Sequence, residues 1–194
     1  HVQIINQIKL VFNKSNRVIK IADIGAGYGH LAKLISKENR FDYHGFEPGI
    51  GRAEFCQKNG LNVVNQLFAI SDEKYDVIIM DNVLEHVSNP IEIIDSIEKS
   101  LNNSGMFICI VPNVFDIRQL NKDWRNRHLW QPDCHINYFS YSDLKRISSK
   151  FNMKLKNFSY KSLADDSSKT LKIKTFLDGV GVHVGGLYTY FIKP

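Results

Sequence analysis

The stretch "IADIGAGYGH", residues 21–30, decides the fold, because a short apolar run leads there into three closely spaced glycines. The run "RVIKIADIG" (17–25) is rich in β-branched residues and predicts a buried strand. A turn alone would need fewer glycines, so this loop predicts a backbone that comes close to a ligand. The next segment, "HLAKLISKEN" (30–39), has helical spacing, and its N-terminus would offer free N–H groups. The glycines are Gly25, Gly27 and Gly29.

Strand-like and helix-like segments alternate from residue 17 to residue 113. We expect strands at 17–25, 41–49, 61–65 and 105–113, a strand that turns into a helix at 75–87, and helices at 2–12, 30–39, 50–60 and 90–101. This alternation predicts an α/β fold in which an open, mostly parallel sheet is covered by helices on both faces. Further on, a helix is expected at 140–151, capped by Ser140 or Ser142, and strands near 153–160 and 186–193.

Length and composition fit one domain over residues 1–194, of which 43% are hydrophobic and 23% charged. Two stretches break the alternation and are expected to form a lid or insertions, near 114–135 and 161–180. The net charge of +5 allows an anionic small substrate or a nucleic acid without requiring either. Three widely spaced cysteines, no signal pattern and no membrane-length apolar run predict a cytoplasmic protein without disulfides.

Two ligands suit the glycine loop, the pyrophosphate of a dinucleotide and the methionine end of S-adenosylmethionine. The dinucleotide fingerprint G-x-G-x-x-G would require a glycine where this chain has His30. Asp23, just before the glycines, would repel a pyrophosphate but attract an ammonium group, directly or through water. Glu47, about 20 residues after the loop, can accept hydrogen bonds from both hydroxyls of a ribose, which either ligand contains. The sequence therefore favours S-adenosylmethionine.

The segment "YDVIIMDNVLEHV" (75–87) would bring several polar side chains to the same edge of the sheet. These are Asp81, Asn82, Glu85 and His86. In an open α/β sheet, ligands bind beyond the carboxyl ends of the strands, so these residues are expected to join the glycine loop in one site.

Together, these stretches make the chain resemble the class I S-adenosylmethionine-dependent methyltransferases. The matching motifs are "ADIGAGYGHL", "FEPG", "YDVIIMDNVLEHVSNP", "LNNSGMFICIVPN" and, in a branch that acts on small molecules and bacterial surface sugars, H-x-N-Y-F-S-x-x-D-L at 135–144. The resemblance implies a Rossmann-like, doubly wound sheet of seven strands, the last two from the tail. It also implies a cofactor site made by Asp23, Gly25, Ala26, Gly27, Glu47, Pro48, Asp81 and Asn82.

The acceptor is expected to bind beside the cofactor. His86 and His135 are candidate bases or acceptor contacts, although His86 could equally pack against the sheet and His135 could pin the lid. A basic, aromatic stretch next to the pocket would suit a phosphate- or carboxylate-bearing acceptor, while such a charge run is more often a solvated face. The candidate acceptor contacts are Arg118, Trp124, Arg125, Arg127 and Tyr138.

No metal is expected. Relatives with a Glu-x-x-Glu-His motif bind a divalent metal, but Asn82 stands here in place of the first glutamate and is a poor ligand. If a metal does bind, the candidate ligands are Glu85, His86 and His135. Cys134 is interpreted as structural, because the sulfonium cofactor already carries an activated leaving group.

The predicted function is methyl transfer from S-adenosylmethionine to a small molecule, most simply to an oxygen of an anionic or sugar-type acceptor such as a nucleotide sugar. An RNA methyltransferase is disfavoured because the turn "DNVL" lacks the proline-rich sequence used on base amines, so no nucleic-acid partner is expected. A non-catalytic S-adenosylmethionine-binding protein is a second alternative, which the glycine loop and Glu47 do not exclude. A dehydrogenase is disfavoured by His30.

Overall fold

A computed structural model describes residues 1–68, 73–158 and 185–194, and these residues contain a seven-stranded sheet. The strands lie in the order β3-β2-β1-β4-β5-β7-β6. Their bounds are β1 Ile19–Ile24, β2 Phe41–Phe46, β3 Val63–Val64, β4 Tyr75–Asp81, β5 Leu101–Val111, β6 Lys154–Asn157 and β7 Leu187–Ile192. The first five strands are parallel, whereas β7 runs antiparallel to both β5 and β6. The sheet predicted from the sequence is confirmed, including the contribution of the tail.

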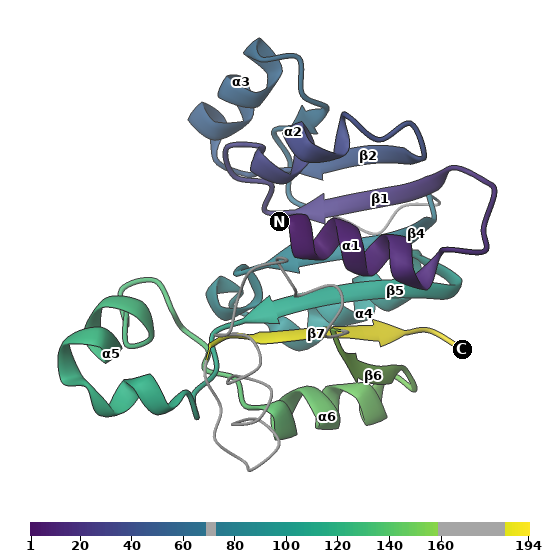
Figure 1. Cartoon of the computed structure of the whole chain (residues 1–194). Coiled ribbons are helices and arrows are strands. Elements are labelled where there is room, and N and C mark those ends of the chain that lie inside the picture. The colour runs from purple at the N-terminus through teal and green to yellow at the C-terminus, as the bar shows by residue number, and fades with distance from the viewer. Residues whose placement is uncertain (69–72, 159–184) are drawn as a thin grey trace, which may run out of the picture.

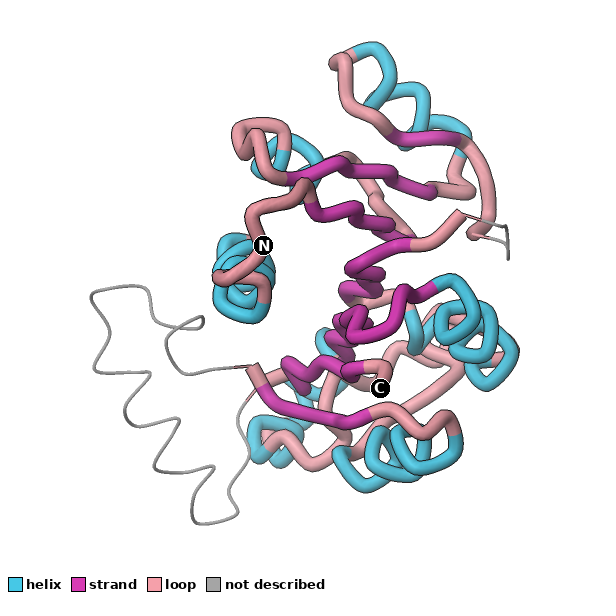
Figure 2. The backbone as a smooth tube through the Cα atoms, turned by 90° about the vertical axis from the view of Figure 1, so that its right-hand side faces the viewer, coloured by secondary structure: helices cyan, strands magenta, loops and turns pink. Residues whose placement is uncertain are grey.

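Helices cover both faces of this sheet, as the end-on view in Figure 2 shows. One apolar cluster joins one face to α1 (Val2–Val11), α2 (His30–Ile35) and α3 (Ile50–Lys58). The other cluster joins the opposite face to α4 (Pro90–Ser100) and α6 (Tyr141–Lys150). The central strands β1, β4 and β5 are buried on both sides, which explains their continuous apolar runs.

Local signals in the sequence set the helix boundaries. Asn89 caps α4 by accepting a hydrogen bond from the backbone N–H of Glu92 at 3.3 Å, and Pro90 occupies the first turn. Ser140, rather than Ser142, caps α6 in a reciprocal capping box with Asp143. Helices α4 and α6 thus begin where the sequence predicted.

Two segments differ from the expected elements. The helix expected to follow β4 is a single 3₁₀ turn, η1 (Leu84–His86), and α2 ends at Ile35 rather than near residue 39. The expected lid contains a 3₁₀ turn, η2 (Ile117–Leu120), and a helix, α5 (Lys122–His128). In Figure 1, α5 lies beyond the end of the sheet toward which β1, β4 and β5 all point. The second expected insertion, 161–180, lies outside the described residues.

None of the helices in the described residues combines the length and the apolar character that a bilayer crossing requires. All three cysteines are free thiols, in agreement with the sequence.

Candidate active site

The glycine loop lies at the carboxyl end of β1, where the strand order reverses between β1 and β4. Its glycines differ in what surrounds them. A side chain on Gly25 would collide with Val83, whose Cγ2 would lie 2.5 Å from the added Cβ. Gly27, at φ +58°, has only the carbonyl oxygen of Gly25 near such a Cβ, at 4.0 Å. The space above Gly27 is therefore open to a ligand, whereas Gly25 is required for packing against the end of β4.

Replacing Gly27 by asparagine is expected to weaken cofactor binding at least tenfold with little loss of stability. Asparagine tolerates a positive φ better than most residues, and its side chain would occupy the space into which the ligand must come. Gly60 provides a matched control, because it has a φ of +70° and no atom within 4 Å of an added Cβ. Calorimetric titration with S-adenosylhomocysteine (SAH) should show normal binding by Gly60→Asn, and equal affinities in both variants would contradict the assignment.

Glu47 follows β2 and is only 2% exposed. One carboxylate oxygen accepts a hydrogen bond from the N–H of Gly27 at 2.9 Å. The other accepts from the N–H of Gly49 at 2.7 Å and from Nε of Arg52 at 2.9 Å. The carboxylate is thus fixed beside the open position of the loop, where a ribose could reach it. Arg52 was not predicted from the sequence, because a helical arginine five residues further on resembles any surface charge.

Asp23 lies beneath the loop and is 4% exposed. It accepts a 2.6 Å hydrogen bond from the hydroxyl of Tyr43. Burial raises the pKa of the Asp23 carboxyl to about 7; the Tyr43 hydrogen bond opposes this rise, and the carboxylates of Asp81 and Glu47 add to it. Three acidic groups therefore surround the loop, and this favours a cationic ligand end over a pyrophosphate.

The end of β4 lies beside the glycine loop, where Val83 packs against Gly25. Asn82 adopts a φ of +54°, donates from its side chain to Oδ1 of Asp81 at 2.8 Å and is held by a backbone bond to Ile110. Burial raises the pKa of the Asp81 carboxyl. The remaining predicted cofactor residues lie in the same region, with Ala26 in the loop and Pro48 exposed beside Glu47. All predicted cofactor residues thus lie at this edge of the sheet.

A second group of residues is assembled from distant parts of the chain. The backbone N–H groups of Ile136 and Asn137 both donate to the carbonyl oxygen of Glu85 at 3.0 Å. The side-chain amide of Asn137 donates to the carbonyl of Val87 at 2.6 Å. These bonds fasten the segment 134–137 to η1. As a result, the rings of His86 and His135 lie with their centroids 4.9 Å apart.

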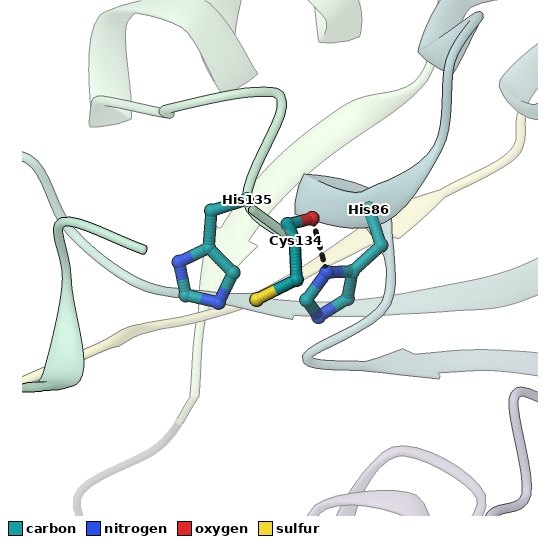
Figure 3. Close-up of side chains that lie close together, drawn as sticks. All are labelled: His86, Cys134 and His135. Carbon is teal, nitrogen blue, oxygen red and sulfur yellow. Dashed lines mark hydrogen bonds between the residues drawn. The ribbon is translucent and has the colours of Figure 1, made fainter. Parts of the chain in front are cut away.

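Both imidazoles are oriented by backbone carbonyls. Nδ1 of His86 lies 2.7 Å from the carbonyl oxygen of Cys134, and Nδ1 of His135 lies 3.0 Å from that of Leu129. A carbonyl can only accept, so each Nδ1 carries the hydrogen and each Nε2 keeps a lone pair. His86 is exposed and His135 is buried. Figure 3 shows the hydrogen bond between the His86 ring and the carbonyl oxygen of Cys134. Both rings can therefore accept a proton through Nε2.

An aromatic pair lies next to these histidines. Trp130 stacks on Tyr138 with centroids 5.2 Å apart, and Tyr138 meets His135 edge-on at 6.4 Å. The Tyr138 hydroxyl is buried and has no hydrogen-bond partner among the described residues. Trp130 is 55% exposed. The pair thus places a partly exposed indole beside the histidines; Tyr138 was a predicted acceptor contact, whereas Trp130 was not.

The basic stretch of the lid is only partly described. Arg118 forms a tight pair with Asp116, with Nη2 2.7 Å from Oδ2, so most of its charge is already compensated. Arg125 is exposed on α5. Trp124 and Arg127 also belong to α5, but their side chains lie outside the described part of the structure. Acceptor binding by these four residues stays a prediction.

Comparison with known proteins identifies the family and the fold. Residues 2–156 match a methyltransferase domain family. No curated protein sequence matches significantly. Similar solved structures include the YcgJ protein from Bacillus subtilis, with 16% identity, TM-score 0.65 and 97% of each chain covered. The plantazolicin methyltransferase BpumL, in complex with a triazolic desmethylPZN analog and SAH, has 17% identity and TM-score 0.72, with 98% of this chain and 83% of that chain covered.

A SAM-dependent methyltransferase from Archaeoglobus fulgidus has 18% identity and TM-score 0.61, with 99% of this chain and 93% of that chain covered. At such identities these structures establish the fold, while the match over residues 2–156 establishes the family. The chain therefore belongs to the methyltransferase domain family and has the fold of the class I S-adenosylmethionine-dependent methyltransferases.

Proposed function

We propose that this enzyme transfers the methyl group of S-adenosylmethionine to an oxygen atom of a small polar molecule. The observation that carries the proposal is the pair of oriented imidazoles, His86 and His135, at the same edge of the sheet as the glycine loop. Val83 connects the two regions, because it packs against Gly25 and directly precedes η1.

The cofactor supplies an activated methyl group on a positively charged sulfur, so the protein mainly has to align the reactants and exclude water. Residues Gly27 and Glu47 would hold the cofactor. Nε2 of His135 or His86 would take the proton of the acceptor hydroxyl while the methyl group passes from sulfur to that oxygen. The products are the methyl ether and SAH, and the proton leaves the imidazole for water.

We propose an anionic or sugar-type acceptor, as found in bacterial surface polysaccharide or secondary-metabolite pathways. The exposed face of Trp130 beside Tyr138 suits a sugar or another flat ring. Arg125 on α5 and the net charge of +5 suit a phosphate or carboxylate. The whole chain would act as one domain in the cytoplasm, where its three free thiols would stay reduced.

Calorimetric titration of the purified protein with SAH and, separately, with NAD tests the proposal. We expect micromolar binding of SAH and no binding of NAD. Binding of NAD alone would contradict the assignment of the glycine loop. Acceptors would then be screened with labelled S-adenosylmethionine, beginning with nucleotide sugars and including an RNA pool. Binding of SAH without turnover on any acceptor would instead favour a non-catalytic cofactor-binding protein.

A further inference from the structure

Three side chains with metal-binding atoms converge beside the proposed acceptor position. His86, Cys134 and His135 each offer one ligand atom, and these atoms all lie within 4.8 Å of one another. Figure 3 shows the sulfur of Cys134 between the two imidazole rings. No other group of three His, Cys, Asp or Glu side chains converges in this way within residues 1–68, 73–158 and 185–194.

The two imidazoles are already arranged as metal ligands usually are. A histidine that binds a metal through one ring nitrogen commonly donates the hydrogen of the other to a carbonyl or carboxylate, which fixes the ring. Here Nδ1 of His86 faces the carbonyl of Cys134, and Nδ1 of His135 faces that of Leu129. Both Nε2 lone pairs are thereby left for a common ligand.

Glu85 gives a second, independent observation beside the cluster. The residue is 1% exposed, and neither carboxylate oxygen has a hydrogen-bond partner in another described residue. Burying a polar group without a partner is costly. Oε1 lies 4.0 Å from Nε2 of His86, so the carboxylate stands beside the cluster. A bound cation would compensate its charge.

We propose that His86, Cys134 and His135 bind a divalent transition-metal ion of the zinc class, next to the carboxylate of Glu85. Two imidazole nitrogens and a thiolate suit Zn²⁺ or Co²⁺ and disfavour Mg²⁺ and Ca²⁺, which prefer oxygen. Bonds of about 2.0–2.3 Å to a tetrahedral ion place two nitrogens and a sulfur about 3.3–3.6 Å apart. The cluster therefore needs to close by at most about 1.5 Å. This proposal departs from the sequence-based expectation, in which Cys134 was structural and no metal was expected.

Three protein ligands would leave the ion able to bind a water or the acceptor. In this role the inference rests on the proposed function. When bound, the ion would supply Lewis-acid activation of the acceptor hydroxyl, whose proton would pass to water. The acceptor oxygen would then bond to the methyl carbon while the carbon–sulfur bond breaks and SAH leaves. The ion would thus replace an imidazole as the group that activates the acceptor.

Cobalt titration tests the site directly. The untagged chain, stripped with a chelator, would be titrated with Co²⁺ and followed by absorption spectroscopy. We expect one equivalent to produce the visible bands of a tetrahedral site and a near-ultraviolet thiolate charge-transfer band, and Zn²⁺ to abolish both. Cys134→Ser should lose the charge-transfer band. His86→Ala and His135→Ala should each weaken binding at least a hundredfold.

His44 provides a matched control, because it pairs with Asp42 at 3.1 Å on β2. Binding by His44→Ala should be normal. The proposal is overturned if the wild-type chain binds no stoichiometric cobalt, or if the charge-transfer band survives in Cys134→Ser. Because His135 is buried, melting curves would check that His135→Ala folds. If it does not fold, His86→Ala provides the same test, because His86 is exposed. Cobalt binding needs neither cofactor nor acceptor, so its failure is distinguishable from a failure to bind SAH.

Discussion

Replacing Glu47 by glutamine is expected to weaken SAH binding by about 10- to 100-fold. The two hydroxyls of a ribose donate hydrogen bonds, and a buried carboxylate can accept both. Glutamine would turn one acceptor into a donor that faces either a hydroxyl or the N–H of Gly27 or Gly49. A hydrogen bond to a charged group contributes about 1.5–3 kcal/mol, which corresponds to this range of affinity. Calorimetry with SAH would measure the change.

The same experiment needs a control for the ion pair with Arg52. Nη2 of Arg52 lies 2.8 Å from Oε1 of Glu47, the same oxygen that accepts from the N–H of Gly49. The side chain of Arg52 is half exposed. Arg52→Gln removes this partner and leaves the carboxylate. We expect its affinity for SAH to be unchanged or higher, since the ribose no longer competes with the arginine. Wild-type affinity in Glu47→Gln would remove Glu47 from the cofactor site.

The sheet was predictable because its signals are local. Buried parallel strands need continuous apolar runs, and "DVIIM" and "MFICIV" have them. The caps Asn89 and Ser140 each accept from a backbone N–H three residues away, so their effect is visible in the sequence. The helix expected after β4 was wrong because a non-local contact decides this segment. "DNVLEHV" has helical spacing, but the carbonyl of Glu85 accepts hydrogen bonds from Ile136 and Asn137, which the sequence does not place beside it.

The site was only partly predictable. The glycine loop and Glu47 can be recognised in the sequence, because each directly follows a predicted strand. The cluster around Cys134 does not, because it depends on bonds between η1 and residues 134–137. The hydrogen-bond partner of the buried Asp23 carboxylate is Tyr43, on a neighbouring strand in a register that the sequence does not reveal. The sequence shows which residue types are present, but it does not show which residues from distant segments become neighbours in space.

Replacing His135 by alanine is expected to lower turnover at least a hundredfold while SAH affinity stays within about threefold. Loss of a group that takes the acceptor proton, whether directly or by holding an ion, typically costs 10²–10⁴ in rate. His135 lies about 5 Å from His86 by ring centroid and contacts Tyr138, but it makes no described contact with the glycine loop or Glu47. Turnover on the acceptor found in the screen and calorimetry with SAH would be measured on the same preparation.

The way in which activity is lost separates the two roles of His135. If the imidazole is the base, chelation should leave wild-type turnover unchanged, and added Zn²⁺ should not raise it. If it holds an ion, chelation alone should abolish wild-type turnover, Zn²⁺ should restore it, and Cys134→Ser should be impaired as well. Unchanged turnover in His135→Ala would contradict both roles. It would leave this histidine a structural role, the hydrogen bond to the carbonyl of Leu129 within the lid.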